Sequence, residues 1–228
     1  PHEELTIIMR RYMMRIAEHI AKENEFYSQL PLWTPQNVTL QPDNLNDAVS
    51  WVAEGTGRVL DFGCGWGLLS ILCVLRGAEK TLGIDLAEEA ISHAKECAAR
   101  LSACSFRHGS IEQLKLLKDA SFDGVILSNI LDNMRPKDAM DAFSHCVRIL
   151  KNGGKLLLKL NPHVSEAEIL AWDMKIISQD LLDDGMLLWN KDDAFWMNLL
   201  TCNFREVRME DVYHAEYDKH ERLFLCVK

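Results

Sequence analysis

The chain has 228 residues, of which 48% are hydrophobic and 26% charged, so it suits one globular domain with an elaboration. No apolar run approaches the ~20 residues that span a bilayer, and no signal-peptide pattern precedes the first helix, so we expect no membrane segment. The net charge of −9 disfavours a nucleic-acid partner, because phosphates would be repelled and the one tight basic cluster is Arg10, Arg11 and Arg15.

The seven cysteines are scattered, and no two have the Cys-x-x-Cys spacing of a zinc or redox site. Most lie within apolar runs, where cysteine behaves as a small hydrophobic residue. An odd number of scattered thiols predicts a cytoplasmic protein, because the cytoplasm keeps thiols reduced. We expect no bound metal.

The first 44 residues are predicted to form a helical cap within the same domain as residues 45–228. Apolar residues recur at helical spacing from residue 3 to about 26. A proline-rich stretch with Tyr27 and Trp33 follows. This cap is a candidate lid over a ligand site, although a helix that simply packs on the domain fits equally well. The apolar stripe consists of Leu5, Ile8, Met9, Tyr12, Met13, Ile16 and Ile20.

From residue 58 onward, short apolar strands alternate with helices. This alternation predicts a doubly wound α/β fold, in which helices cover both faces of a mostly parallel sheet. A capping box at Ser165 and Glu168 starts a late helix, and the tail reads as two strands, at about 203–209 and 222–228, joined by a long polar loop. Other expected strands lie at 58–62, 80–84, 103–107, 122–127 and 155–160, and helices at 45–54, 68–76, 87–101 and 136–150.

The strongest local signal is a strand that enters a glycine turn and opens directly into a helix. Glycines stand at 63, 65 and 67, after Asp61. Glycine lets the backbone approach a ligand closely and adopt positive φ, and the following helix offers free N–H groups to an anion. At the carboxyl end of a strand in an open α/β sheet, this turn predicts a nucleotide-type ligand site.

Two ligand classes fit this turn. A dinucleotide site wants Gly-x-Gly-x-x-Gly, whose third glycine would be residue 68, which is Leu. The sequence Asp61-Phe-Gly63-Cys-Gly65-Trp-Gly67 instead resembles motif I of the class I S-adenosylmethionine-dependent methyltransferases. There the anion is the carboxylate of the methionine part of the cofactor.

Two further segments resemble the same family. Asp85, at the end of the second strand, can accept both hydroxyls of a ribose, or it could only cap the helix with Glu88. Gly109-Ser110-Ile111 resembles the segment beside the adenine, usually Gly-Asp-Ala, with Ser in place of Asp. Alternatively, Ser110 forms a capping box with Gln113.

Residues 121–133 are similar to the family's fourth-strand segment, and Ile149-Leu-Lys-Asn-Gly-Gly-Lys to its entry into strand five. The succession of segments over about 58–160 identifies the chain as a member of this family. The resemblance implies a seven-stranded, Rossmann-like, mostly parallel sheet with an antiparallel last strand, and S-adenosyl-L-methionine as cofactor. The cofactor residues that it implies are Asp61, Phe62, Gly63, Cys64, Gly65, Asp85, Leu86, Ser110, Ile111 and Asn129.

Methyl transfer from a sulfonium needs alignment of the acceptor more than any one catalytic group, and a general base only if the acceptor must lose a proton. Candidate acceptor-side residues are Asn129, Asp132 and Asn133 after the fourth strand and His163 after the fifth. His214 and His220 flank the last hairpin and carry no metal argument. Trp189 and Trp196, in an expected helical insert, are predicted to pack rather than to line a pocket.

Two competing functions share these features. An NAD-dependent oxidoreductase has the same turn and acidic ribose residue, and a non-catalytic partner protein could keep the cofactor site for assembly. The acidic charge favours a small-molecule acceptor over nucleic acid, with a protein acceptor still open. The sequence indicates neither the attacking atom nor the oligomeric state.

Overall fold

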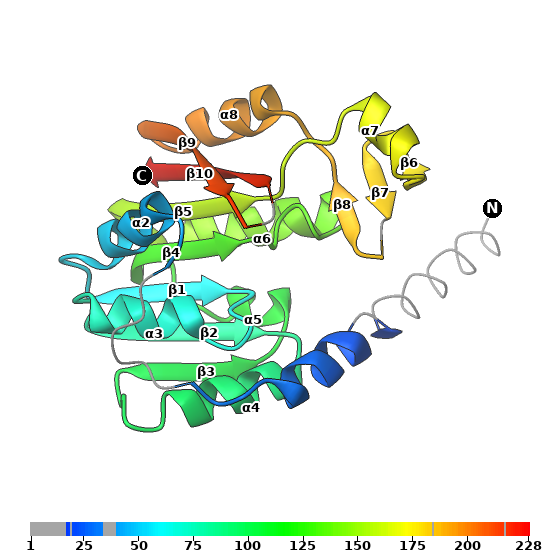
Figure 1. Ribbon diagram of the computed structural model, residues 1–228. Helices are drawn as coiled ribbons and strands as arrows, with labels where there is room; N and C mark the ends of the chain where they lie inside the picture. Colours follow the sequence, from blue (N-terminus) through cyan, green and yellow to red (C-terminus); the bar gives the residue numbers. More distant parts are fainter. Residues whose placement is uncertain (1–16, 19, 34–39, 184, 217) are drawn as a thin grey trace, which may run out of the picture.

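The computed structural model describes residues 17–18, 20–33, 40–183, 185–216 and 218–228. A seven-stranded sheet forms its centre, with the spatial order β3-β2-β1-β4-β5-β10-β9 (Figure 1). Strands β3, β2, β1, β4 and β5 pair in parallel, and β10 is antiparallel to both of its neighbours, as predicted. The strands are β1 (Arg58–Phe62), β2 (Lys80–Asp85), β3 (Cys104–His108), β4 (Phe122–Ser128), β5 (Leu150–Leu160), β9 (Glu206–His214) and β10 (Lys219–Val227).

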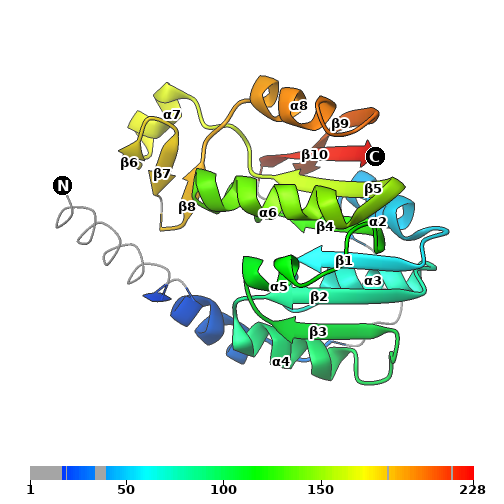
Figure 2. The ribbon, with the colours of Figure 1, turned by 180° about the vertical axis from the view of Figure 1, so that it is seen from behind.

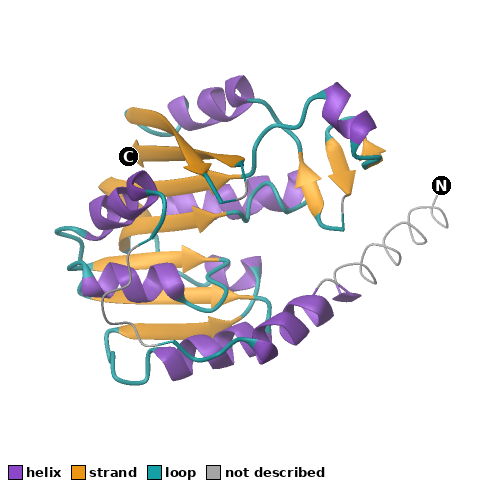
Figure 3. Cartoon of the chain, in the orientation of Figure 1, coloured by secondary structure: helices purple, strands orange, loops and turns teal. Residues whose placement is uncertain are grey.

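Helices cover both faces of this sheet (Figure 3). Successive strand residues point to opposite faces, so Val59 packs with α2 and α3, seen in front in Figure 1, and Leu60 with α6, seen in front in Figure 2. The predicted doubly wound architecture is thereby confirmed. The helices are α2 (Asp43–Ala53), α3 (Leu68–Leu75), α4 (Glu88–Cys97), α5 (Ile111–Lys115), α6 (Pro136–Ile149), α7 (Glu166–Ala171) and α8 (Asp193–Thr201).

A second, three-stranded sheet stands beyond the carboxyl ends of the parallel strands (Figure 1). It consists of β6 (Lys175–Ser178), β7 (Leu181–Asp183) and β8 (Leu187–Trp189), where the sequence predicted only helix. Trp189 lies on β8 and Trp196 on α8, and their rings contact edge to face at 5.4 Å. Both side chains are buried, so the prediction that they pack is confirmed, whereas the helical assignment of Trp189 was wrong.

The last hairpin is longer than predicted. β9 and β10 extend to His214 and from Lys219, so only residues 215–218 connect them in place of a long polar loop. Most side chains of β9 are exposed, because this strand is the edge of the sheet, and its polar sequence therefore resembled a loop. Likewise β5 begins at Leu150 rather than 155, since Gly153 N–H donates to the carbonyl of Lys228 at 2.8 Å.

The described part of the N-terminal cap includes a helix over residues 20–29, which lies beside the start of α4 (Figure 2). Asn24 Oδ1 accepts from the N–H of Glu89 at 3.0 Å, and the ring of His93 bonds to the carbonyl of Pro31 at 3.2 Å. Residues 1–16, with most of the predicted apolar stripe, the three arginines and Tyr12, lie outside the described residues. None of the helices that the structure describes is long and apolar enough to cross a membrane.

Candidate functional site

The glycine turn lies between β1 and α3, where the strand order reverses because β1 pairs with β2 on one side and β4 on the other. Ligands of open α/β sheets bind at this switch point. Gly65 and Gly67 have φ values of +49° and +80°, which disfavour any residue with a Cβ atom. A Cβ on Gly67 would lie 2.7 Å from the Phe106 ring, so this glycine lets the turn pack against β3.

Most N–H groups of the turn already have partners inside the protein. Gly63 and Cys64 donate to the carbonyl of Ile84 at 2.8 and 3.1 Å, and Gly65 donates to Asp85 Oδ2 at 2.7 Å. The first N–H groups of a helix have no acceptor within that helix. An anionic ligand group would therefore bind at the start of α3 rather than along the whole turn.

Asp61 lies beneath the turn and is almost fully buried, with 1% of its surface exposed. Its Oδ2 accepts from the hydroxyl of Ser70 at 2.7 Å. Burial raises the pKa of Asp61 to about 7, the hydrogen bond from Ser70 opposes this rise, and the nearby Asp85 adds to it. A cation placed beside Asp61 would stabilise its ionised form. The neighbouring side chains of Phe62 and Cys64 are buried, so they could meet a ligand only through backbone.

Asp85 ends β2 and its carboxylate spans the turn and the start of α4. Oδ2 accepts from Gly65 and Oδ1 accepts from the N–H of Ala87 at 2.9 Å. Burial raises the pKa of Asp85, and these backbone hydrogen bonds oppose the rise. Each oxygen keeps a further lone pair, so the carboxylate can still accept from ribose hydroxyls. Ala87, not Asp85, is the N-cap of α4, and the helix start has no side-chain cap, so the alternative of a capping box between Asp85 and Glu88 is not favoured.

The segment predicted to lie beside an adenine follows β3. Ser110 is the N-cap of α5, and its hydroxyl accepts from the N–H of Glu112 at 3.3 Å. The reciprocal bond of a capping box with Gln113 is not among the contacts of this cap, so that alternative is not favoured. Leu86 is 43% exposed, Ile111 is partly buried, and the ring of His108 bonds to the carbonyl of Leu86 at 2.9 Å.

Two side chains lie over the ligand face of the turn. A Cβ on Gly65 would be 2.7 Å from the hydroxyl of Tyr27, and a Cβ on Gly63 would be 2.9 Å from Ile130. Burial raises the pKa of Tyr27, and the charges of Glu23 and Asp85 add to the rise. The N-terminal cap thus reaches the glycine turn through Tyr27, whereas Ile130 comes from the loop after β4.

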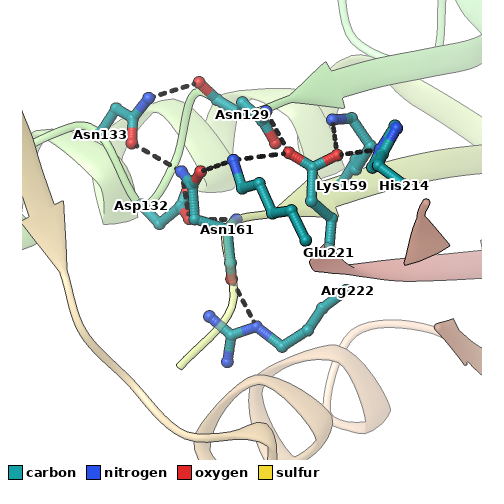
Figure 4. A network of polar contacts seen from close by, with 9 residues as sticks. Asn129, Asp132, Asn133, Lys159, Asn161, His214, Glu221 and Arg222 are labelled. Carbon is teal, nitrogen blue, oxygen red and sulfur yellow. Dashed lines mark hydrogen bonds and ion pairs between the residues drawn. The ribbon is translucent and has the colours of Figure 1, made fainter. Parts of the chain in front are cut away.

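Polar side chains gather where β4 and β5 end and the last hairpin turns, and we call Asn129, Lys159, His214, Lys219 and Glu221 the Glu221 cluster (Figure 4). Glu221 is 4% exposed and lies at its centre. Lys159 Nζ lies 2.5 Å from Glu221 Oε2, and the ring nitrogen Nε2 of His214 lies 3.0 Å from the same oxygen. The Nδ2 of Asn129 and the Nζ of Lys219 reach Oε1 at 3.1 and 3.2 Å.

Asp132 forms a second polar group next to this cluster (Figure 4). Its Oδ2 accepts from the backbone N–H and the side-chain amide of Asn161 at 2.7 and 3.1 Å, and that amide also donates to Asn133 at 3.0 Å. Burial raises the pKa of Asp132, with the Asn161 bonds opposing the rise. Its carboxylate is buried, and its bonds to Asn161 join the loop after β4 to the end of β5.

The structure brings some predicted acceptor-side residues together and separates another. Asn129, Asp132 and Asn133 lie in connected polar groups, whereas His163 is exposed and lies near Glu168 at the start of α7. The sequence reasoning missed Lys159 and Glu221. A signal was present, since Lys159 interrupts the apolar run of β5, and a charge in a buried strand needs a partner.

A glycine turn at the switch point, with a carboxylate on the adjacent strand, defines a nucleoside-binding protein of the doubly wound α/β class. A family model described as a methyltransferase domain matches residues 59–154, which include the turn, Asp85, β3 and β4. Residues 59–154 thus match a methyltransferase domain, in agreement with the resemblance of this part of the sequence to the class I S-adenosylmethionine-dependent methyltransferases. Among the described residues, no three His, Cys, Asp or Glu side chains gather in a way that could hold a metal ion.

Curated relatives are similar to about half of the chain. The ubiquinone biosynthesis O-methyltransferase of Xanthomonas campestris pv. campestris is 36% identical over 120 residues, which cover 52% of this chain and 49% of that protein. The chain thus spans about half the length of the curated relatives it matches.

Solved structures share the fold at low identity. The N-methyltransferase NodS from Bradyrhizobium japonicum WM9, in complex with S-adenosyl-L-homocysteine, matches with a TM-score of 0.67 and 16% identity, over 92% of this chain and 98% of that one. The 1,6-didemethyltoxoflavin-N1-methyltransferase of Burkholderia thailandensis matches with a TM-score of 0.65 and 15% identity, over 100% and 90% of the two chains.

Proposed function

We propose that the protein transfers a methyl group from S-adenosyl-L-methionine to an oxygen of a small-molecule acceptor, releasing S-adenosyl-L-homocysteine. The observation that carries this proposal is the union of the glycine turn and Asp85, joined by the 2.7 Å bond from Gly65. Residue 68, where a dinucleotide site wants glycine, is the first residue of α3 and is Leu. No comparison favours an NAD-dependent oxidoreductase or a non-catalytic partner protein.

The charges around the turn suit this cofactor. The methionine part carries an ammonium and a carboxylate, and the former would pair with Asp61, whose burial without a cation raises its pKa to about 7. The carboxylate would bind at the start of α3, and the ribose at Asp85. We assign cofactor contact to the residues that the sequence predicted: Asp61, Phe62, Gly63, Cys64, Gly65, Asp85, Leu86, Ser110, Ile111 and Asn129.

The choice of an oxygen acceptor rests on the name of the Xanthomonas relative, an O-methyltransferase. The net charge of −9 supports a small molecule over a nucleic acid. The cofactor supplies an activated methyl group, so the main task of the protein is to hold the acceptor oxygen in line with it. All seven cysteines are free, which supports a reducing compartment such as the cytoplasm.

We also propose that residues 1–44 act as a cap over the cofactor site. Support comes from Tyr27, whose hydroxyl lies against Gly65, and from the bond between Asn24 and the start of α4. Deletion of residues 1–40 would then lower activity and cofactor affinity while leaving a folded domain. Unchanged activity in a folded deletion variant would contradict the cap.

Calorimetric titration of the protein with S-adenosylhomocysteine and with NAD tests the proposed function directly. We expect binding of the former only. A donor-dependent assay for S-adenosylhomocysteine, run over small hydroxyl, amino and thiol compounds with mass spectrometry of the product, then identifies the acceptor. Binding of NAD alone, or methyl transfer only to nitrogen or sulfur, would contradict the proposal in its first or its second part.

A further inference from the structure

The Glu221 cluster joins four segments at the end of the sheet where the acceptor would enter. Asn129 follows β4, Lys159 lies on β5, His214 ends β9, and Glu221 is near the start of β10 (Figure 4). Asn129 is also a proposed cofactor residue, and its Nδ2 lies 3.1 Å from Glu221. The cluster is therefore continuous with the proposed cofactor site. Every cluster residue from Lys159 onward lies outside the segment that the methyltransferase model matches, 59–154.

Structural stability alone is a weak reason for such a cluster. The side chains of Lys159 and Glu221 are 10% and 5% exposed, so both charges are largely desolvated. Replacing a buried ion pair by apolar side chains is often neutral or stabilising. In addition, Asn129 Oδ1 is buried without a hydrogen-bond partner among the described residues, as is common where a ligand or water completes a site.

The hydrogen bonds of Glu221 fix the protonation of the His214 ring. Burial opposes the charge of Glu221, but the ammonium of Lys159 and the amide of Asn129 lower its pKa to about 2. An ionised carboxylate only accepts hydrogen bonds, so Nε2 of His214 must carry the proton of their 3.0 Å contact. In the neutral ring, Nδ1 then carries no hydrogen and can accept a proton.

We propose that His214, held by Glu221, is the general base for an acceptor with an acidic hydroxyl, such as a phenol or enol. Lys159 is a positioning residue that holds Glu221, and Lys219, which is 43% exposed, stabilises the oxygen anion. This inference rests on the proposed function. The hydroxyl proton moves to Nδ1 of His214, the oxygen forms its bond to the methyl carbon, and the carbon–sulfur bond breaks with its electron pair on sulfur. His214 then releases the proton to water.

The charged groups around Glu221 set the net charge of the cluster. Glu221 approaches it from β10, and Lys159 and Lys219 lie on the other sides of the same carboxylate. Two ammonium groups near one carboxylate leave the cluster net positive when His214 is neutral. That balance disfavours a cationic amine acceptor and favours an oxygen that becomes negative when its proton leaves, before it attacks the methyl group.

Two catechols of different acidity test the base. Catechol is neutral near pH 7, whereas 4-nitrocatechol ionises more readily and needs less help from a base. For His214→Gln we expect kcat/KM for catechol to fall ~10²–10⁴-fold, and for 4-nitrocatechol to fall far less. The matched control is His220→Gln, since His220 lies on the same hairpin with its own carboxylate partner, Asp211, at 2.8 Å, and we expect wild-type rates.

The test of Glu221 must remain informative even if a single substitution prevents folding. Glu221→Gln leaves Lys159 buried without a counter-charge, so the double variant Lys159→Met with Glu221→Leu is compared with it. We expect the double variant to fold and bind S-adenosylhomocysteine like wild type, yet to methylate catechol as poorly as His214→Gln. Wild-type catechol rates in the folded double variant would overturn the positioning role.

Direct binding separates this inference from the proposed function. With S-adenosylhomocysteine bound, the absorbance of added 4-nitrocatechol reports its ionisation, and we expect its apparent pKa to fall by about one unit in wild type and less in Lys219→Met. No binding of S-adenosylhomocysteine would contradict the proposed function itself. Two results would overturn this inference alone, provided that S-adenosylhomocysteine binds normally. One is an equal loss of kcat/KM for both catechols in His214→Gln, and the other is that the wild-type protein methylates neither catechol.

Discussion

Two halves of the same edge of the sheet, where the parallel strands end, are built in different ways. After their proposed roles we call the half at β1 and β2 the cofactor end and the half at β4, β5 and β10 the acceptor end. At the cofactor end, most of the proposed binding groups belong to the backbone. The glycine turn occupies five consecutive residues, and Asp85 follows 20 residues after the Gly65 N–H that it accepts. At the acceptor end, side chains from distant segments meet, since 92 residues separate Asn129 from Glu221 and 62 separate Lys159 from it.

This difference explains why the cofactor end could be predicted from the sequence and the acceptor end could not. A backbone turn can be made by few residue types, so it leaves a local signature in the sequence. A cluster of side chains can be assembled from many positions, and each member looks ordinary by itself. We therefore expect the acceptor end to carry what is specific to this protein, as the methyltransferase model, which stops at residue 154, also suggests.

The largest effect is expected on stability at the acceptor end. Glu221→Ala leaves the ammonium of Lys159 buried without a counter-charge, which we expect to lower the free energy of unfolding by about 3–5 kcal/mol. Urea denaturation measures this loss, and the double variant Lys159→Met with Glu221→Leu should recover most of it. As a control, Glu210→Ala breaks the more exposed pair with Arg208 and should cost less than about 1 kcal/mol. If Glu221→Ala and Glu210→Ala lowered the free energy of unfolding equally, burial of the Glu221 cluster would not determine its contribution to stability.

The fold could be predicted from the sequence because its signals are local. Alternating apolar runs predicted the five parallel strands. The helix expected from residue 136 and the capping box at Ser165 correspond to helix starts that the structure contains. The small sheet β6–β8 was missed, since its strands have three or four residues and all of β6 is exposed. Such short segments show no periodicity that separates strand from helix.

The candidate site could be predicted only in part, for the same reason. Asp61, Asp85 and the turn could be predicted as site residues because they lie close together along the chain. The pairing of Lys159 with Glu221 depends on the antiparallel register of β5 and β10, which no local pattern specifies. The sequence offered only the absence of metal partners for His214. Its contact with Glu221, seven residues away, depends on the pairing of β9 with β10.

At the cofactor end, the next effect concerns affinity. Asp85→Ala removes the carboxylate that would accept from the ribose, and we expect the affinity for S-adenosylhomocysteine to fall by about 1–3 kcal/mol. Calorimetry measures the change, with Glu96→Ala on the exposed face of α4 as a control that leaves affinity unchanged. An unaltered affinity in a folded Asp85→Ala variant would refute the ribose assignment.

The pH dependence of binding should come from Asp61. Its pKa of about 7 in the folded protein exceeds its ordinary value of 3.8, so the folded state holds an extra proton between these values and its stability falls as pH rises through this range. A ligand ammonium beside Asp61 favours the ionised form. Affinity for S-adenosylhomocysteine should therefore rise from about pH 5.5 to 7.5, by less than tenfold per pH unit, with release of up to about one proton.

Calorimetry in buffers of different ionisation enthalpy counts the released protons, and Asp61→Asn serves as the matched variant. The amide keeps an acceptor for the hydroxyl of Ser70 but cannot titrate. Proton release should disappear in this variant. Release that persists unchanged would assign the pH dependence to another group.

The smallest effect tests whether the family pattern still operates where this chain departs from it. Ser110 stands where related sequences usually have Asp, and it caps α5 through a 3.3 Å bond. Ser110→Asp keeps a capping side chain and adds a charged acceptor for the adenine amino group, so we expect S-adenosylhomocysteine to bind about 2- to 10-fold more tightly. Ser110→Ala, which loses the cap, should weaken binding by less than tenfold and lower stability by about 0.5–2 kcal/mol. If Ser110→Asp instead weakened binding, the adenine would not lie beside α5, and the assignment of Ser110 and Ile111 would have to be withdrawn while that of Asp85 stood.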